Sequence, residues 1–343
     1  MNLNNTSFDL RDVEQYCMGA GVIPISVCPE TNVPYFLLGR ERWLPSWKGS
    51  CRWSGFEGSR KECENTRMTA AREFVEESMG CVRMCPSDRP YDRIRDVIQC
   101  LEKRIYWKRI VLRIDTERPI ERYHTTFLVP IAWCTEIPTR FFNTRMGVEQ
   151  VDRLVQEWNC TRPYNLGELG EIIGPITVTD GIAYVQKSID TSPCILRRPW
   201  KRDGGILTAT FSEPSDVNSI VIWSALRERL TRAVHRCNHP CVSKVCDERW
   251  RLLQQVHVNA DYLEKDQVRW WSINELGDVI SAKGQLGADR FRPYFLPVLQ
   301  TALNLVRSRM EELNWVTTAP SSTEEEEEEE EFGAQEDVCN VCE

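Results

Sequence analysis

The sequence of 343 residues predicts an α/β fold in which a sheet packs with helices and is interrupted by a largely helical insertion. Apolar runs bounded by turn residues at 20–28 and 33–39 predict two strands of a hairpin. Residues 65–78 have helical periodicity, and strand-like runs return at 255–261 and 267–271 after a long middle segment. Further strands are predicted at 51–55, 94–101, 104–114 and 123–131.

The composition predicts a chain that can form a hydrophobic core, because 41% of its residues are hydrophobic. We expect no membrane association, since no apolar run reaches about 18 residues. The polar residues 1–12 lack the apolar region of a secretory signal, so the 15 cysteines are expected to stay reduced. A cytoplasmic location follows as an expectation, and a nuclear one is not excluded.

Charge is distributed unevenly along the chain. The net charge is −8, but residues 324–343 alone hold 11 acidic residues and no Lys or Arg. Residues 1–323 therefore carry 43 basic and 40 acidic side chains. A slightly basic body suits a polyanionic substrate. The run of eight glutamates predicts a disordered tail, which either solubilises the protein or shields its basic surface.

The most specific pattern in the chain lies between residues 58 and 80. On a helix of 3.6 residues per turn, its three last carboxylates share one face, and an arginine lies one turn from the second of them. Carboxylates crowded in this way repel one another, and a hard divalent cation with oxygen ligands offsets the repulsion. The alternative is a solvated acidic face. The fixed positions are Gly58, Glu64, Arg72, Glu73, Glu76 and Glu77.

This spacing resembles the Nudix box, Gly-x5-Glu-x7-Arg-Glu-U-x-Glu-Glu-x-Gly-U, where U is aliphatic or aromatic. The last glycine falls one position late, at Gly80, which predicts a longer exit turn. The resemblance implies an α/β/α sandwich with a mixed sheet and a phosphoanhydride hydrolase that uses Mg²⁺ or Mn²⁺. It also implies roles for the box residues: Glu73, Glu76 and Glu77 as metal-holding catalytic residues, Gly58 as a carbonyl ligand, and Glu64 and Arg72 as structural residues.

Two segments carry basic residues next to aromatic ones and are candidates for substrate binding. Arg40 follows the second predicted strand, and Trp43 and Trp47 come soon after it. Tryptophans there could stack on a base, and a methylated guanine would add a cation–π contribution. Lys108 and Arg109 follow Tyr106 and Trp107 on a predicted strand. The alternatives are core tryptophans and the charged outer face of an ordinary sheet.

The middle segment predicts helices at 147–158, 179–188 and 216–236 and carries a basic cluster around one tryptophan. Lys and Arg that contact phosphates bind nucleic acid of any sequence, so we expect this insertion to bind RNA. A zinc site among the histidines and cysteines of 235–257 is conceivable, although the spacing is unusual. The basic residues are Arg197, Arg198, Lys201 and Arg202.

The sheet pattern resumes after the insertion. Ser272 and Glu275 are in capping-box register and predict a helix start, and a long helix is predicted from 291 to about 314. By resemblance to the Nudix family, a carboxylate before the closing strand serves as base or extra ligand, and Glu264 is the candidate, with Asp266 as the alternative. The predicted division is a first Nudix part (1–140), the insertion that we expect to bind RNA (141–255), a closing strand and helix (256–316), and a disordered acidic tail (317–343).

The box does not specify the substrate. The basic insertion and acidic tail suit a long polyanion, and the layout resembles the mRNA-decapping Nudix enzymes of large DNA viruses. That resemblance implies capped RNA as substrate, m7GDP and 5′-monophosphate RNA as products, and a host cytoplasmic location. One alternative is a pyrophosphatase for nucleoside diphosphate derivatives or diphosphoinositol phosphates. Another is a non-catalytic RNA-binding protein on the same scaffold. Protein partners cannot be inferred.

Overall fold

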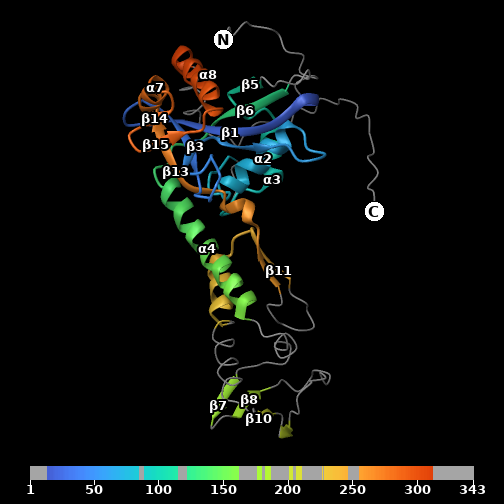
Figure 1. The fold of residues 1–343 in the computed structure, drawn as a ribbon. Coiled ribbons are helices and arrows are strands. Elements are labelled where there is room, and N and C mark those ends of the chain that lie inside the picture. The colour runs from blue at the N-terminus through green and yellow to red at the C-terminus, as the bar shows by residue number, and fades with distance from the viewer. Residues whose placement is uncertain are drawn as a thin grey trace, which may run out of the picture.

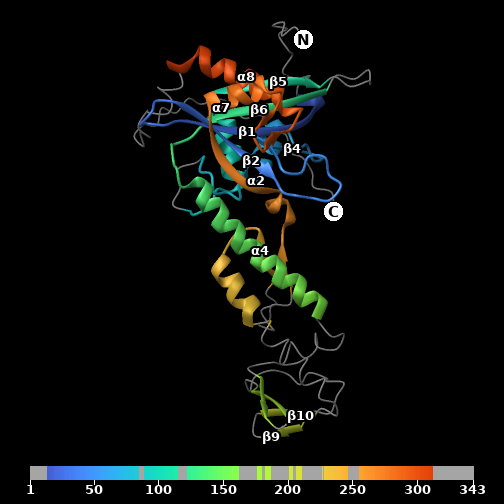
Figure 2. The ribbon, with the colours of Figure 1, turned by 60° about the vertical axis from the view of Figure 1, so that its left-hand side comes forward.

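A globular part holds the N-terminal and C-terminal elements, and an arm built from the middle of the chain extends away from it (Figures 1 and 2). Elements distant in sequence therefore meet in the globular part. The computed structural model describes residues 14–84, 89–114, 122–161, 176–179, 182–186, 201–203, 206–210, 226, 228–245 and 255–311.

The globular part is built on a nine-stranded mixed sheet. Its main path runs β14-β15-β3-β2-β1-β6-β5, while β13 pairs with β2 and β4 pairs with β1. The β1–β6 and β15–β3 pairs are parallel, and the other pairs in the sheet are antiparallel. Its strands are β1 (Cys17–Val27), β2 (Pro34–Glu41), β3 (Arg52–Ser54), β4 (Phe56–Ser59), β5 (Lys108–Ile114), β6 (Arg122–Pro130), β13 (Lys265–Ser272), β14 (Gln285–Leu286) and β15 (Asp289–Phe291).

Helices cover both faces of this sheet. Because side chains alternate along a strand, Val22 of β1 belongs to the core on one face and Ile23 to the core on the other. The first core includes α2 (Thr66–Glu77) and α3 (Ile94–Glu102), and the second includes α7 (Ile273–Ser281) and α8 (Phe295–Ser308). The predicted sandwich with a mixed sheet is confirmed.

The arm begins with α4 (Ile137–Thr161) and returns through a helical segment at 228–237. A hairpin of β11 (Val242–Val245) and β12 (Gln255–Val258) leads back to a 3-10 helix, η1 (Ala260–Leu263), which precedes β13. A second sheet has the order β7-β8-β10-β9. Its strands are β7 (Ile176–Thr179), β8 (Ile182–Gln186), β9 (Lys201–Asp203) and β10 (Ile206–Thr210).

Two predicted elements have a different secondary structure: one predicted strand is a helix, and one predicted helix is a pair of strands. Residues 94–101 form α3 and not a strand, because Val97 and Leu101 are one helical turn apart and both are buried in the core beside α2. Residues 179–188 were predicted as a helix, but β7 and β8 pair antiparallel there, with Val178 opposite Ala183. Of the helix predicted at 216–236, the structure describes residue 226 and residues 228–236 as helical. The tail at 317–343 lies outside the described residues.

Other expectations concern membranes and cysteines. Among the described helices, none has both the length and the apolar character that crossing a membrane requires. Cys100 is disulfide-bonded. Cys100 therefore departs from the expectation that the cysteines stay reduced. The other cysteines with described side chains are free thiols: Cys17, Cys28, Cys51, Cys63, Cys81, Cys134, Cys237 and Cys241.

The capping box predicted at the start of α7 is confirmed, and it generates a stability prediction. Ser272 Oγ accepts from the Glu275 amide at 3.2 Å, while Glu275 Oε2 accepts from the Ser272 amide at 2.9 Å. Ser272→Ala should lower the free energy of unfolding by about 1 kcal/mol, measured by urea denaturation. Ser281→Ala, at the exposed end of the same helix, is the control and should change it by less than about 0.5 kcal/mol. Equal effects would contradict a capping role for Ser272.

Candidate active site

The box helix α2 is held so that one face packs on the sheet and another faces a cavity. Asn65 caps it, since its side-chain oxygen accepts from the Met68 amide at 2.9 Å. Phe74 is fully buried and meets Phe56 of β4 edge to face, with ring centroids 5.6 Å apart. This packing fixes the rotation of α2 about its axis, and with it the direction of the carboxylates.

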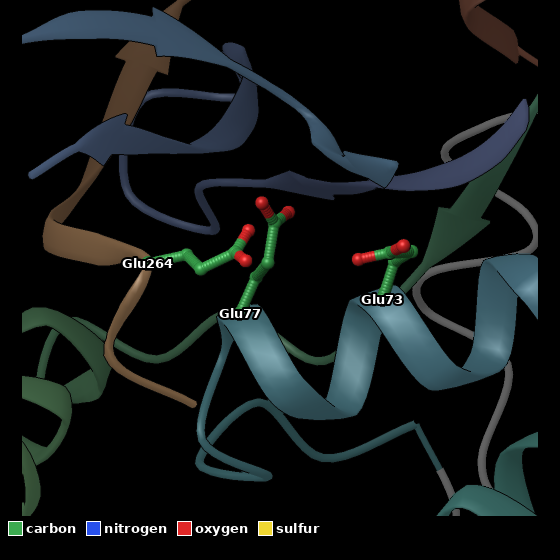
Figure 3. Close-up of side chains that lie close together, drawn as sticks. All are labelled: Glu73, Glu77 and Glu264. Atoms are coloured by element: carbon green, nitrogen blue, oxygen red, sulfur yellow. The ribbon is translucent and has the colours of Figure 1, made fainter. Parts of the chain in front are cut away.

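Three carboxylates from two separate segments converge beside α2. Glu73 and Glu77 lie one turn apart on the helix, and Glu264 reaches toward them from the end of η1 (Figure 3). Each offers an oxygen, and these oxygens all lie within 4.8 Å of one another. Glu73 and Glu77 are buried, whereas Glu264 is exposed. A buried pair with an exposed third member forms a cluster that solvent can reach from one side.

Burial makes the charged form of this cluster costly. Burial raises the pKa of Glu73 to about 7, although Arg72 opposes the shift. Burial also raises the pKa of Glu77 well above its usual value against the attraction of Lys265, and burial raises that of Glu264. A bound cation would remove this cost, and carboxylate oxygens are the ligands that Mg²⁺ and Mn²⁺ prefer. The donor set therefore fits such an ion.

Arg72 donates hydrogen bonds to three carboxylates of the box and so orders them. Its Nε donates to Glu64 Oε1 at 2.6 Å, and its Nη1 donates to Glu73 at 2.7 Å and to Glu76 at 3.1 Å. Although burial acts in the other direction, the hydrogen bond from Arg72 lowers the pKa of Glu64 to about 2. Glu64 is thus an ionised anchor for Arg72. Glu76 lines the cavity but does not belong to the cluster of three.

The glycine that opens the box lies against the cluster. A Cβ placed on Gly58 would be 2.2 Å from Glu73 Oε1, which no side chain could tolerate without displacing that carboxylate. A Cβ on Gly19 of β1 would be 2.5 Å from the Gly58 carbonyl oxygen. Gly58 therefore allows the backbone of β4 to come close to Glu73, and Gly19 allows β1 to come close to β4. The close approach is the structural reason for glycine at position 58.

A buried lysine holds the third carboxylate of the helix. Lys265 is fully buried, and its Nζ lies 2.6 Å from Glu41 Oε1 and 3.1 Å from Glu77 Oε1. The other oxygen of Glu77 accepts from the backbone amide of Glu57 at 2.7 Å. Arg292 also donates to Glu41, at 2.7 Å. Glu77 is therefore fixed at both oxygens by groups from β4 and β13.

A second buried pair lies on the sheet side of the cavity. His124 Nε2 is 3.0 Å from Glu57 Oε2. Although burial opposes the change, this contact lowers the pKa of Glu57. Among the described residues, the other oxygen of Glu57 has no hydrogen-bond partner.

The cluster opens into a cavity of about 520 Å³. Aromatic rings and cations adjoin at its border: Arg292 lies 5.3 Å from the ring centroid of Trp47 and 4.5 Å from that of Tyr294. A space lined by carboxylates, cations and aromatic rings can accept a diphosphate joined to a base. The charged lining residues are Glu41, Glu57, Arg60, Lys61, Arg72, Glu73, Glu76, Glu77, Asp261, Glu264 and Arg292.

The candidate site residues from the sequence divide into three groups. Seven of them line the cavity: Gly58, Arg72, Glu73, Glu76, Glu77, Glu264 and Trp47. Glu64 adjoins the cavity through its ion pair with Arg72. Four others lie elsewhere: Arg40, Trp43, Lys108 and Arg109. The side chains of Arg197, Arg198, Lys201 and Arg202 lie outside the description, although Lys201 and Arg202 belong to β9.

None of the other four lines this cavity. Arg40 pairs with Asp266 at 2.8 Å, so Asp266, the alternative to Glu264, points to this arginine and not to the cluster. Trp43 is 68% exposed and borders a different hollow between its loop and α4. Lys108 lies over the Trp107 ring at 5.4 Å, and Arg109 pairs with Glu14 at 3.1 Å.

Sequence reasoning missed five groups that build the site. Glu57 could have been noticed, because a charged residue flanked by Phe56 and Gly58 is unusual in a buried strand. The others give no local signal, since their burial follows from which strands pair. These residues are Glu41, Glu57, His124, Lys265 and Arg292.

Comparisons with known proteins find neither a matching family model nor a matching curated protein. Among solved structures, a Nudix hydrolase from M. smegmatis is 15% identical over 35% of this chain and 63% of its own, with a TM-score of 0.24. A C. elegans Ap4A hydrolase is 15% identical over 33% and 64%, with a TM-score of 0.20. The NUDIX domain of Shewanella oneidensis NrtR, complexed with ADP ribose, is 11% identical over 37% and 68%, with a TM-score of 0.21.

The match covers less than two thirds of the first two chains. Likenesses at these TM-scores decide nothing about activity, and the functional inference depends on the site itself.

Lys265→Met tests the buried ion cluster. The change leaves Glu77 without its ammonium partner in a buried position, so the free energy of unfolding should fall by about 3–5 kcal/mol. Urea denaturation in EDTA measures it, with Lys103→Met, at an exposed helix end, as the control. A loss below about 1 kcal/mol would show that the cluster does not depend on Lys265.

The raised pKa of Glu73 predicts how the metal-free protein responds to pH. The folded state retains a proton on Glu73 up to about pH 7 that the unfolded state loses near 4.5, so stability should fall as pH rises through this window. Buried His239, whose pKa burial lowers, acts in the opposite direction. The wild-type Tm minus the Glu73→Gln Tm, in EDTA, should therefore decrease from pH 5 to pH 7.5. A constant difference would contradict the raised pKa.

Proposed function

We propose that this chain is a Nudix-type hydrolase that cleaves a phosphoanhydride with Mg²⁺ or Mn²⁺, and that its substrate is 5′-capped RNA. The observation that carries the proposal is the cluster of Glu73, Glu77 and Glu264 at the end of a cavity of about 520 Å³. Hydrolysis between the phosphates of the cap would release m7GDP and 5′-monophosphate RNA.

In this proposal the box residues have different roles. Glu73 and Glu77 would hold the metal, with Glu76 and the carbonyl of Gly58 as further ligands, and Arg72 keeps Glu73 and Glu76 oriented. The bound cation would neutralise the diphosphate and act as a Lewis acid. Lys265 and the Glu57 amide keep Glu77 in place before any substrate arrives.

Glu264 is the proposed general base. It is the exposed member of the cluster, so a water molecule can reach it. Burial raises the pKa of its carboxyl, which favours proton transfer from water. The proton from the attacking water would then reside on the Glu264 carboxylate.

The rest of the cavity supports binding of a nucleoside diphosphate. Lys61 and Arg292 offer positive charge to the phosphates. Trp47 offers a partly exposed ring for stacking on a base, and a methylated guanine would add a cation–π attraction. Of the tryptophans proposed from the sequence, Trp47 therefore suits this role better than Trp43, which lies outside the cavity.

Support for a long RNA comes from the arm. Its helical segment at 228–237 exposes Arg229, Arg232 and Arg236, which could contact phosphates. Arg229 lies 3.6 Å from Glu157 and Arg232 lies 3.7 Å from Glu228, and both arginine side chains are more than half exposed. In this proposal, they would contact RNA together with the basic residues of 197–202.

Small-molecule hydrolysis is the competing function, and the cavity favours it in one respect. All the groups proposed for chemistry and base stacking lie around a single space of about 520 Å³, whereas Lys108 and Arg109 lie outside it. Comparing rates for capped RNA and free cap dinucleotide separates the two. A decapping enzyme should prefer capped RNA and lose the preference as salt rises. Equal rates at all salt concentrations would favour the small-molecule activity.

Glu73→Gln tests catalysis itself. Removing one ligand charge should lower kcat/KM for cap-labelled RNA by about 10²-fold or more, because bound metal contributes several kcal/mol to the transition state. Thin-layer chromatography of the products measures the rate. Glu62→Gln, an exposed residue in the loop before α2, is the control and should keep full activity. If Glu73→Gln is as active as wild type, or if neither cleaves capped substrates, the chain is not the proposed decapping enzyme.

A further inference from the structure

His239 of the arm contacts both segments that supply the carboxylate cluster, next to Glu77 and next to Glu264. His239 Nε2 is 2.9 Å from the carbonyl oxygen of Met79, which follows Glu77 by two residues. Its ring meets Tyr262 edge to face with centroids 5.5 Å apart, and Tyr262 precedes Glu264 by two residues. The same ring therefore touches the helix exit after Glu77 and the turn before Glu264.

The contacts around His239 fix its tautomer and its orientation. The Cys241 amide donates to Nδ1 at 3.2 Å, so the proton lies on Nε2, which donates to Met79. The side chain is nearly fully buried, and burial lowers its pKa, so the neutral ring persists at neutral pH. Tyr91 packs on it from a further side, with centroids 4.6 Å apart.

The helix exit that His239 contacts has an unusual backbone. Met79 and Gly80 both have left-handed conformations, with φ of 55° and 61°, where one glycine would normally suffice. A non-glycine residue pays for this conformation in steric strain, so the surroundings must hold it. The Met79 side chain is fully buried, and its carbonyl accepts the His239 hydrogen bond. This is the longer turn that the displaced glycine of the box predicted.

Backbone hydrogen bonds also connect the segment of His239 with the Glu264 turn. Two residues after it, the carbonyl of Cys241 accepts from the Asn259 amide at 3.0 Å. The β11–β12 pairing continues this connection, with Val242 opposite Val258. The part of the arm that carries His239 and the turn that carries Glu264 are therefore joined by backbone hydrogen bonds as well as by the ring contact.

We propose that His239 is a positioning residue that sets the separation of Glu77 and Glu264, so that the insertion forms part of the metal site. This inference rests on the proposed function. The ring acts through the Met79 carbonyl and Tyr262 and touches no reacting atom. It follows that metal binding and the order of the arm are coupled, and thermodynamic linkage requires the coupling to act in both directions.

A core histidine that only supports the fold would not produce this coupling. Amide hydrogen exchange of wild-type protein with and without Mn²⁺ therefore tests the proposal without a substitution. Exchange in residues 228–245 should slow when Mn²⁺ is added, while exchange in α8, on the opposite face of the sheet, should change less. If Mn²⁺ binds and protects only the segments around α2 and Glu264, the coupling does not exist and the proposal is overturned.

Substitution tests the same coupling from the arm. His239→Leu removes the Nε2 donor, and His239→Gln keeps an amide donor without the ring. Isothermal titration with Mn²⁺ should show affinity weakened about 10- to 100-fold in the leucine variant, the range found for residues that orient metal ligands. A smaller loss is expected for glutamine. His257→Gln, exposed on β12, is the matched control and should bind as wild type does.

The outcomes are distinguishable from failure of the proposed function. Wild-type protein that binds no Mn²⁺ contradicts the proposed metal-dependent hydrolase. Wild-type binding with an unchanged Mn²⁺ affinity in folded His239→Leu overturns the role of His239 alone, even if that variant has a lower Tm. If neither His239 variant folds, Tyr262→Leu removes the contact from the other side, and the wild-type exchange experiment still decides.

Discussion

The structure of the site depends on the groups that hold the crowded carboxylates of the box helix in place. Glu73 and Glu77 are buried one turn apart, and each keeps its place because a fixed group holds it: Arg72 for Glu73, and Lys265 with the Glu57 amide for Glu77. Burial still favours the protonated forms, so these partners compensate only in part. A divalent cation bound by these carboxylates would supply the remaining compensation.

This constraint explains why distant segments of the chain meet. The buried lysine comes from β13, its second partner Glu41 from the end of β2, and the exposed carboxylate Glu264 from the turn that ends the insertion. The register of β13 on β2 places Lys265 opposite Glu41. A sheet that closes only after the insertion therefore completes the site, and the path of the arm helps to determine where Glu264 lies.

Local patterns allowed the sequence to predict the box helix, its carboxylate face and the capping box at Ser272, because spacing alone determines these features. Glu264 was placed by resemblance to the Nudix family. Glu41 and Lys265 could not be found, since each looks like an ordinary residue at a strand end until the pairing of β2 and β13 is known. The same limit produced the two wrong elements, where short apolar stretches suit either a strand or a helix and tertiary packing decided.

The most direct test of the central claim is a crystal structure of the protein soaked in Mn²⁺, with anomalous diffraction recorded at the manganese absorption edge. The account predicts an anomalous peak at the cluster of Glu73, Glu77 and Glu264, with Glu73 and Glu77 each contributing at least one oxygen at bonding distance. A peak elsewhere, or carboxylates that remain hydrogen-bonded to Arg72 and Lys265 with no ion between them at saturating Mn²⁺, would contradict it.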